Sequence, residues 1–550
     1  MRYTIGYDFG SLSVRGVLME LDTGYVQFSA TFDYPHGIMS DALPNGVPLE
    51  PDWALQLPAD YLQGLHYVTQ RILEQSGVNP EQIVGICIDT TACTMLPTTA
   101  EGTPLCDLEQ FASNPHAYVK LWKHHAAHPY TEEIEQLAAA RKETWFGRIG
   151  GKVSSEHYLA KCLEIAYKAP ELYETAERLI QIGDWLVWKL TGQETRGYCT
   201  AAFKTFYDQQ TGDISKAFLK ELHPLLENLS EKQPGQVVPD GGVAGYLTDE
   251  AARWLGLCSG TVVAPAATDA HVTVHGCHVN RPNDMVMIVG TSACQIMMGK
   301  DYKEFPGLNG IAESALIPGM AVFEGGQSCV GDMFAWFVEH CVPATYVERA
   351  EAEQKSVHTL LTDLAARLSP GESGVIALDW WNGVRSTLMD FDLSGLIVGL
   401  SLDTPPEAVY RALLEATAFG LRRILQTMME NGLKVESLYA TGGIAKKNPL
   451  LMQIYADVCN CDIQIVEENH TSALGSAILA AAAVLYGSSG PDHLHELLEK
   501  YRQPIKTIYH PNADAAAVYR ELYEMYCELY VHFGTETSLM KRLRKMRKKR

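Results

Sequence analysis

The chain has 550 residues, more than one hydrophobic core usually serves, so its length predicts two domains. Its composition is 47% apolar and 20% charged, which is typical of a folded globular enzyme and excludes a largely disordered protein. The formal net charge of −22 repels nucleic-acid phosphates and anionic lipids, so we expect neither nucleic acid nor a membrane as a partner.

The N-terminus has no basic segment followed by an apolar one, and no later stretch offers eighteen uninterrupted apolar residues. Thirteen cysteines without CxxC pairs do not form the pattern of a disulfide framework. These features predict a soluble, cytoplasmic protein. The last ten residues, 541–550, form a basic run, and we expect a mobile, solvated tail over 535–550 in preference to a membrane or RNA tether.

Two β-hairpins with similar turns are predicted about 280 residues apart. The first joins strands at 3–9 and 14–19 through Gly10 and Ser11. The second joins strands at 285–289 and 294–298 through Gly290 and Thr291. This repeat indicates two related lobes, with a boundary near residue 280.

The segments around these hairpins predict a mixture of helices and strands. Apolar spacing predicts helices over 61–73 and 155–167. The capping box Thr404-Pro405-Pro406-Glu407 predicts a helix that runs to Gly432. The other expected elements are strands within 83–96, at 438–440 and at 463–466, and helices over 448–458, 473–485 and 514–533.

Small turns between strands can present backbone N–H groups to a phosphate chain. The turns at Gly10-Ser11 and Gly290-Thr291 have this form, and Asp8 lies beside the first, where a carboxylate can hold Mg²⁺ through water. A third turn, Gly442-Gly443, permits close approach of a nucleoside, and Asn448 can hydrogen-bond to it. Each turn also has an ordinary structural explanation, but their combination favours a nucleotide site.

Three segments resemble the nucleotide-binding segments of the FGGY carbohydrate-kinase family. They are Asp8-Phe9-Gly10-Ser11 with Ser13 and Arg15, Gly290-Thr291-Ser292, and Thr441-Gly442-Gly443-Ile444-Ala445-Lys446-Lys447-Asn448. The resemblance extends from about Tyr3 to Phe533. It implies an α/β fold of two actin-like (ribonuclease H-like) lobes with a nucleotide cleft between them. The implied domains are a sugar-binding lobe at 1–280, a nucleotide-binding lobe at 281–495 and a helical segment at 496–534.

Three further segments resemble those of ribulokinases, a group within this family: 91–97, 115–125 and 324–328. Lys123 to Ala126 replace an acidic and an arginine position found in many relatives with other substrates, which counts against a xylulokinase or glycerol kinase. The resemblance implies ATP and Mg²⁺ as cofactors and transfer of the γ-phosphoryl group to O5 of ribulose, in pentose catabolism. A kinase for another ketose or polyol, such as xylulose, ribitol or glycerol, is the alternative.

The resemblance places the catalytic base at Asp269 and sugar contacts at Ala92, Lys204 and Glu324. A carboxylate can accept the proton of a sugar hydroxyl, while Lys204 and Glu324 offer a donor and an acceptor. From the pattern alone, Asp269 is equally a capping residue, Lys204 an exposed strand lysine and Glu324 part of a helix start. The implied nucleotide contacts are Gly10, Ser11, Ser13, Arg15, Gly290, Thr291, Gly442, Gly443 and Asn448, with Mg²⁺ at Asp8.

Other functions remain open from the sequence. His271, His275 and His278, with Cys277, have a helical spacing that can serve a transition metal, although the intervening 272–274 also fits a strand. A non-catalytic regulator that binds sugar or nucleotide would keep the same fold. A chaperone-type ATPase needs a peptide-binding domain, for which no residues remain. The expected partners are a small sugar and ATP, and a homodimer is compatible with the sequence.

Overall fold

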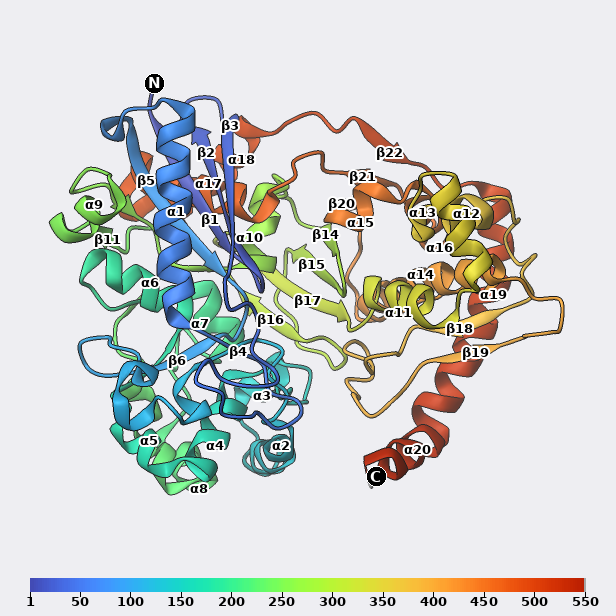
Figure 1. The fold of residues 1–550 in the computed structure, drawn as a ribbon, viewed down its shortest axis with the longest axis horizontal. Helices are drawn as coiled ribbons and strands as arrows, with labels where there is room; N and C mark the ends of the chain where they lie inside the picture. The colour runs from blue at the N-terminus through green and yellow to red at the C-terminus, as the bar shows by residue number, and fades with distance from the viewer. Residues whose placement is uncertain (549–550) are drawn as a thin grey trace.

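A computed structural model of the protein describes residues 1–548. Two lobes lie side by side, each built on a mixed sheet (Figure 1). Between the two sheets lie two helices, α10 (Asp269–Gly276) and α17 (Thr471–Tyr486); α10 contacts both sheets. The predicted two-lobed α/β architecture is therefore present.

The first sheet has the strand order β11-β12-β5-β1-β2-β3, and β13 also pairs with β5. Its strands are β1 (Tyr3–Phe9), β2 (Ser13–Glu20), β3 (Val26–Asp33), β5 (Ile83–Thr90), β11 (Gly245–Tyr246), β12 (Val262–Val263) and β13 (Ala267–Thr268). Every residue of β1 is buried, as expected for a central strand covered on both faces. One face of this sheet packs against α1 (Pro58–Ser76) and the other against α17.

The second sheet has the order β16-β17-β15-β14-β20-β21-β22. Its strands are β14 (Asp284–Val289), β15 (Ala293–Gly299), β16 (Gly310–Glu313), β17 (Ala321–Gln327), β20 (Ser437–Thr441), β21 (Ile463–Ile465) and β22 (Thr507–Tyr509). The antiparallel hairpins β1–β2 and β14–β15 confirm the predicted repeat. Each first strand is also parallel to the strand on its other side, so β3-β2-β1-β5-β12 and β17-β15-β14-β20-β21 share one topology.

A helical subdomain extends from the first lobe, at the bottom of Figure 1. Its strands β4 (Leu55–Gln56), β6 (Met95–Thr98), β7 (Val119–Lys120) and β8 (Arg178–Gln181) form a small sheet. The helices of this region and of the adjoining lobe are α2 (Thr131–Arg141), α3 (Thr144–Arg148), α4 (Tyr158–Lys168), α5 (Pro170–Thr175), α6 (Ile182–Thr191), α7 (Tyr198–Lys204), α8 (Lys216–Leu222) and α9 (Asp249–Leu255). Strands β9 (Thr195–Gly197) and β10 (Gln236–Val238) pair separately.

The second lobe carries its helices on the side away from the first lobe (Figure 1). They are α11 (Gly331–Cys341), α12 (Ala344–Ala352), α13 (Val357–Ala365), α14 (Pro406–Glu430), α15 (Gly443–Lys447), α16 (Pro449–Cys459) and α19 (Ala513–Val531). A separate antiparallel pair is formed by β18 (Ile376–Leu378) and β19 (Leu396–Val398), and β18 packs against α14 and α19. Helix α18 (Leu494–Tyr501) packs against α17.

The crossing of α10 and α17 depends on two glycines. A Cβ atom at Gly276 would lie 1.8 Å from the carbonyl oxygen of Thr471, and one at Gly475 would lie 2.0 Å from that of Val272. These two glycines therefore allow α17 to approach α10 closely. By length and composition the stretch Thr471–Tyr501 is sufficient to cross a membrane, but 67% of its apolar window is buried inside the protein.

The predicted capping box before α14 is wrong. The helix runs over Pro406–Glu430, and its N-cap is Pro405, without a side-chain cap. The hydroxyl of Thr404 instead accepts a hydrogen bond from the Ser401 backbone at 2.9 Å. Because that turn already uses the Thr404 side chain, the capping contact to Glu407 does not form.

The expected mobile tail over 535–550 is also wrong within the described residues. Leu539–Lys548 forms helix α20, and Met540 is 5% exposed. Lys541 and Arg544 pair with Asp390 and Asp392 at 2.5 and 3.4 Å. This segment forms a helix because its apolar residues have helical spacing and its basic residues pair with an acidic loop. Residues 549–550 lie outside the described range.

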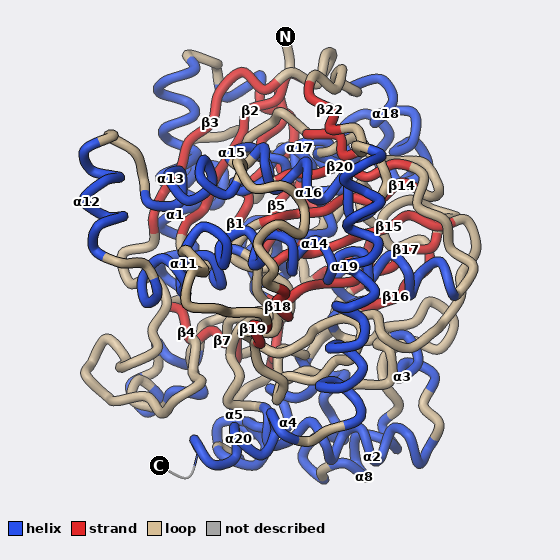
Figure 2. The backbone as a smooth tube through the Cα atoms, turned by 90° about the vertical axis from the view of Figure 1, so that its right-hand side faces the viewer, coloured by secondary structure: helices blue, strands red, loops and turns tan. Residues whose placement is uncertain are grey.

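The expected helical segment at 496–534 contains strand β22, which extends the second sheet, as well as helix α19. Figure 2 shows α19 running down the face of the second lobe, with α20 turning away at its foot. The chain from β22 to α20 is therefore packed on the second lobe, whereas Tyr501 at the end of α18 donates a hydrogen bond to the Leu21 carbonyl of the first lobe.

Candidate active site

The first hairpin turn lies at the carboxyl end of β1. The Gly10 N–H donates to the Ser13 carbonyl at 3.0 Å, which closes the turn. Asp8 is largely buried, and its Oδ2 accepts a hydrogen bond from Arg15 Nη1 at 3.3 Å. Arg15, predicted to contact phosphate, is therefore paired with the predicted Mg²⁺ residue and 42% of its side chain stays exposed.

Ser11 connects this turn to the helical subdomain. Its hydroxyl accepts a hydrogen bond from Trp122 Nε1 at 2.9 Å, and its carbonyl accepts one from Gln56 Nε2 at 2.8 Å. Trp122 belongs to the segment 115–125, which the sequence assigned to sugar recognition. The turn predicted to bind phosphate is thus in direct contact with the segment that resembles a ribulokinase segment.

Three aspartates gather at the carboxyl ends of adjacent parallel strands. Asp8 in β1 is the register partner of Asp89 in β5, and Asp89 is the partner of Ala267 in β13. Asp269 follows two residues later, as the first residue of α10. The ends of parallel strands are where open α/β sheets usually bind ligands.

Burial and mutual repulsion raise two of these pKa values. Burial, with the charge of Asp8 next, raises the pKa of Asp269 to about 7. The same two causes raise the pKa of Asp89 well above its usual range. Ser476 of α17 donates to Asp89 Oδ2 at 2.7 Å, while Asp89 Oδ1 has no partner within residues 1–548.

The donor set fits Mg²⁺ held through water and phosphate. Within residues 1–548 no group of three or more His, Cys, Asp or Glu side chains is arranged to hold a metal ion by itself. Mg²⁺ usually keeps several waters and binds one or two carboxylates together with substrate phosphates. Asp8, one residue before the end of β1 and beside the Gly10 turn, offers that kind of partial coordination.

The predicted sugar contacts Lys204 and Glu324 meet across the two lobes. Lys204 Nζ lies 2.8 Å from Glu324 Oε2, and His271 Nε2 lies 3.3 Å from the same oxygen. Burial alone would raise the pKa of Glu324, but Lys204 and His271 hold it well below its usual range. Burial would lower the pKa of Lys204, but Glu324 raises it instead. Both side chains are charged at neutral pH.

Neither ordinary explanation of these two residues is correct. Lys204 is the last residue of α7 and is buried, so it is not an exposed strand lysine. Glu324 lies within β17 and does not begin a helix. Asp269 does begin a helix, yet its Oδ1 accepts only the N–H of Ala270, at 2.8 Å.

The predicted contact Ala92 lies in the turn after β5 and is half-buried. This turn is fixed by Lys161, a fully buried residue of α4. Its Nζ donates to the carbonyl oxygens of Cys93 and Leu121, each at 2.8 Å. Burial lowers the pKa of Lys161 to about 8. Lys161 therefore ties together the two segments that resemble sugar-recognition segments.

The other two glycine turns follow adjacent parallel strands. Ile288 in β14 is the register partner of Thr441 in β20, so the turns at Gly290 and Gly442 emerge side by side. The N–H groups of Val330 and Gly331 donate to Thr291 and Gly290 carbonyls at 2.8 and 3.1 Å, respectively. The second turn is thereby fixed at the start of α11.

Asn448 lies at a helix start, as predicted, but its side chain has a structural partner. Asn448 Oδ1 accepts a hydrogen bond from the Leu451 N–H at 3.0 Å and caps α16. The cap uses the Oδ1 acceptor of Asn448, so its contact with a nucleoside would be a hydrogen bond donated by Nδ2. The cap explains this asparagine without a ligand.

The histidine spacing does not form a metal site. Helix α10 ends at Gly276, and His278 lies beyond it with φ +55. His278 therefore does not share a helical face with His271 and His275. His271 faces Glu324 instead. The His271 ring is neutral at physiological pH because burial lowers its pKa.

Comparisons with known proteins agree with this arrangement. The N-terminal domain of the FGGY family of carbohydrate kinases matches residues 3–276, and the C-terminal domain matches residues 285–484. The chain belongs to the FGGY family of carbohydrate kinases. The family prediction is confirmed, and the chain is identified as a member of a group of sugar-phosphorylating enzymes.

Two relatives are similar over nearly their whole length. The ribulokinase of Geobacillus thermodenitrificans is 46% identical over 99% of this chain and 97% of its own. The ribulokinase of Bacillus licheniformis is 44% identical over 98% of each chain.

Solved structures support the fold. A xylulose kinase from Rhodospirillum rubrum has a TM-score of 0.78 at 23% identity and covers 96% of this chain and 99% of its own. A gluconate kinase from Lactobacillus acidophilus has a TM-score of 0.79 at 20% identity and covers 97% of this chain and 98% of its own. The predicted fold of two actin-like lobes is confirmed.

The roles assigned to individual residues stay predictions, although the structure brings most of them together. Two residues of the site were missed by the sequence reasoning. Asp89 is the second-last residue of the buried strand β5, and a carboxylate directly after the apolar residues 86–88 was a usable signal. Lys161 gave no signal, because a lysine at helical spacing normally faces solvent.

Proposed function

We propose that this FGGY kinase transfers the γ-phosphoryl group of ATP to O5 of ribulose, giving ribulose 5-phosphate and ADP, in L-arabinose and pentose catabolism. The observation that carries the proposal is the position of Asp269. Asp269 begins α10 two residues after the register partner of Asp89. His271 on the same helix lies 3.3 Å from Glu324 Oε2, so Asp269 is near both the carboxyl end of β1 and the predicted sugar contacts. The ribulokinase relatives support the choice of sugar.

In the proposed reaction, O5 of ribulose attacks the γ-phosphorus, and the bond from that phosphorus to the β–γ bridging oxygen breaks. Asp269 accepts the proton of the attacking hydroxyl, for which a pKa near the working pH is well matched. Lys204 donates to a sugar oxygen, and Glu324 accepts from a sugar hydroxyl. Mg²⁺ beside Asp8 supplies positive charge that offsets the phosphates.

Both lobes contribute residues to the site in this proposal. Residues 1–280 supply the sugar contacts Ala92 and Lys204 and the phosphate turn at Gly10, and residues 281–495 supply the sugar contact Glu324 and the nucleotide turns at Gly290 and Gly442. Closure of the lobes excludes water, which would otherwise accept the phosphoryl group. We place the enzyme in the cytoplasm, since its thirteen cysteines are free thiols that suit a reducing compartment.

The test is an ADP-release assay with Mg-ATP on a panel of L-ribulose, D-ribulose, ribitol, L-arabinitol, D-xylulose and glycerol. A strong preference for ribulose supports the proposal. Preference for another member keeps the kinase and changes its substrate. Binding of ATP with no turnover on any member would replace the kinase by a non-catalytic regulator.

A further inference from the structure

Arg385 of the second lobe reaches the first lobe beside the sugar contacts. It lies in the loop between β18 and β19, and its Nη2 donates to Glu156 Oε1 at 3.1 Å. Glu156 lies in the turn before α4. The two side chains are only 15% and 18% exposed. The Arg385 guanidinium also lies over the Trp122 ring, 5.9 Å from its centroid.

The position of Arg385 is tied to that of Glu324. Gly326 is two residues further along β17, so both residues face the same side of the strand. A Cβ atom at Gly326 would lie 2.7 Å from Arg385 Cδ, so a larger residue there would displace the arginine. The charge of Glu324 also acts on the pKa of Arg385, which is raised although burial opposes it.

On the first lobe, Glu156 lies among sugar-site groups. Burial would raise its pKa, but Arg385 and then His125 hold it below its usual range. Burial lowers the pKa of the neighbouring His157 to about 4, and the charges of Lys204, Glu156 and Glu324 all act on it. Glu156 is therefore an ionised carboxylate, and the hydroxyl of the adjacent Ser155 lies 3.0 Å from His125 Nδ1 in the segment 115–125.

The loop that carries Arg385 is rigidly supported from behind. Ser386 exchanges hydrogen bonds with Gly326: its N–H donates to the Gly326 carbonyl at 3.0 Å, and its Oγ accepts from the Gly326 N–H at 3.1 Å. Thr387 Oγ1 lies 2.6 Å from the hydroxyl of Tyr530 in α19. These contacts fix the backbone directly after the arginine, and directly before it Val384 exchanges backbone hydrogen bonds with Asp390, both at 2.9 Å.

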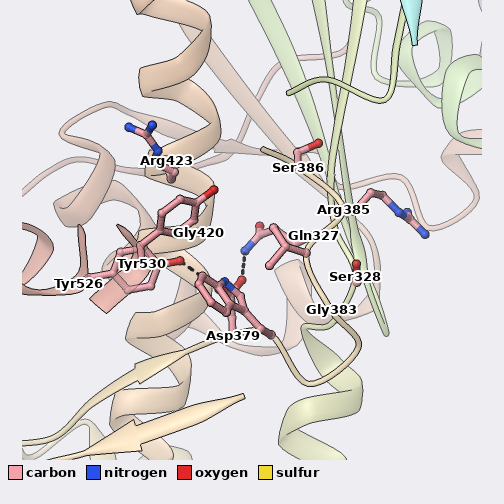
Figure 3. A pocket seen from close by; sticks show the side chains of 12 residues that line it. Gln327, Ser328, Asp379, Gly383, Arg385, Ser386, Gly420, Arg423, Tyr526 and Tyr530 are labelled. Carbon is pink, nitrogen blue, oxygen red and sulfur yellow. Dashed lines mark hydrogen bonds between the residues drawn. The ribbon is translucent and has the colours of Figure 1, made fainter. Parts of the chain in front are cut away.

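A buried polar network lies behind the same loop (Figure 3). Asp379 accepts hydrogen bonds from Gln327 Nε2 at 2.9 Å and from the Tyr526 hydroxyl at 3.2 Å. The cavity between them measures about 10 Å³, which leaves room for at most one water molecule. In Figure 3 the Arg385 side chain points away from this cavity. The network supports the loop and leaves the guanidinium for the interlobe contact.

We propose that Arg385 and Glu156 are positioning residues that form an interlobe latch over the sugar pocket. The latch holds the lobes at the spacing in which Lys204 and Glu324 both face the sugar. It rests on the proposed function, because the pocket it closes is the one assigned to ribulose.

The latch differs from the interlobe pair of Lys204 and Glu324. Those two residues are proposed to exchange their mutual contact for sugar hydroxyls. The loop that carries Arg385 is held by hydrogen bonds, and a guanidinium can donate two hydrogen bonds at once, which suits a fixed contact between the two lobes. Its loss should loosen closure rather than remove a contact with the sugar.

The test is a double-mutant cycle with Arg385→Gln, Glu156→Gln and the combined variant. Each single variant should raise the KM for ribulose about tenfold or more and leave the KM for Mg-ATP unchanged. Each should also hydrolyse more ATP per ribulose 5-phosphate formed, because an open site admits water. The combined variant should be no worse than the worse single variant, since both lose one shared interaction.

Arg178→Gln is the matched control. Arg178 pairs with Glu194 at 2.8 Å with exposed fractions of 20% and 22%, close to those of the latch, but both residues belong to the first lobe. This variant should leave the ribulose KM and the coupling of hydrolysis to transfer unchanged. The same shift in Arg178→Gln and Arg385→Gln would assign the effect to general loosening and overturn the latch.

X-ray scattering gives a readout that does not depend on turnover. The wild-type protein should contract when ribulose and a non-hydrolysable ATP analogue are added, and the Arg385→Gln protein should contract less. Unchanged ribulose KM, or additive effects in the cycle, would disprove the latch while the kinase function stands. A wild-type protein inactive on every sugar of the panel would instead disprove the proposed function.

Discussion

Lys204 Nζ and Glu324 Oε2 are 2.8 Å apart and join the end of α7 in one lobe to β17 in the other. Their side chains are only 9% and 12% exposed. A buried charge that loses its partner keeps the cost of its desolvation without the compensating attraction. The pair therefore matters to stability as well as to sugar binding.

Glu324→Ala should raise the KM for ribulose at least about tenfold and lower the free energy of unfolding by about 3 kcal/mol, because Lys204 is left buried without its partner. Steady-state kinetics and denaturant unfolding measure the two effects. Glu436→Ala is a suitable control, since Glu436 pairs with Lys434 at the surface, with 49% and 75% of the side chains exposed. An effect of Glu324→Ala confined to the KM for ATP would mean that Glu324 is not in the sugar site.

Asp269→Asn should lower kcat about a hundredfold or more and leave ATP affinity near normal, because the amide cannot accept the proton of the sugar hydroxyl. Product formation and calorimetric titration with ATP separate the two properties. Asp249→Asn makes the same change at the exposed first position of α9 and should have no effect on turnover. Undiminished turnover in Asp269→Asn would remove this residue from the role of base.

The pKa of Asp269, raised to about 7 by burial and then by Asp8, predicts a pH dependence. The base acts in its deprotonated form, so activity is full above this pKa and falls as the pH drops through it. At pH 6, kcat/KM for ribulose should be about a tenth of its plateau value. A profile between pH 5.5 and 9 measures this limb. A flat profile over that range would contradict the assignment of the base.

The repeated hairpins could be predicted because each strand pattern and turn is local in sequence. The same holds for the glycine turn before Asn448, which follows from small residues in a short segment. Asp89 and Lys161 could not be found in this way. Their environments come from chain segments far apart in sequence, as the contacts of Asp89 to Ser476 and of Lys161 to Leu121 show.

The two structural errors, at the start of α14 and in the tail, have a similar origin. The local motif at Thr404 predicted a capping box, but the Thr404 hydroxyl instead accepts a hydrogen bond from the Ser401 backbone N–H. In the tail, the basic charge predicted a mobile segment, whereas the apolar spacing of Leu539, Met540 and Leu543 is that of a helix. The acidic residues that receive this helix lie about 150 positions earlier, beyond the reach of a local pattern.

The C-terminal helix offers a test of whether that contact orders the end of the chain. Met540 is 5% exposed in α20, whereas Leu543, three residues later, is 57% exposed. Met540→Ala should free the helix from the second lobe, because loss of a buried methionine side chain costs about 2 kcal/mol or more. Hydrogen exchange should then become faster in 539–546 and in the loop at 388–392.

Leu543→Ala provides the matched control on the same helix and should leave exchange in both segments unchanged. Equal acceleration in the two variants would show that helix propensity, rather than docking of Met540, orders the segment. No acceleration in Met540→Ala would mean that the ion pairs of Lys541 and Arg544 suffice to hold the helix. In that case high salt, which screens partly exposed ion pairs, should release it.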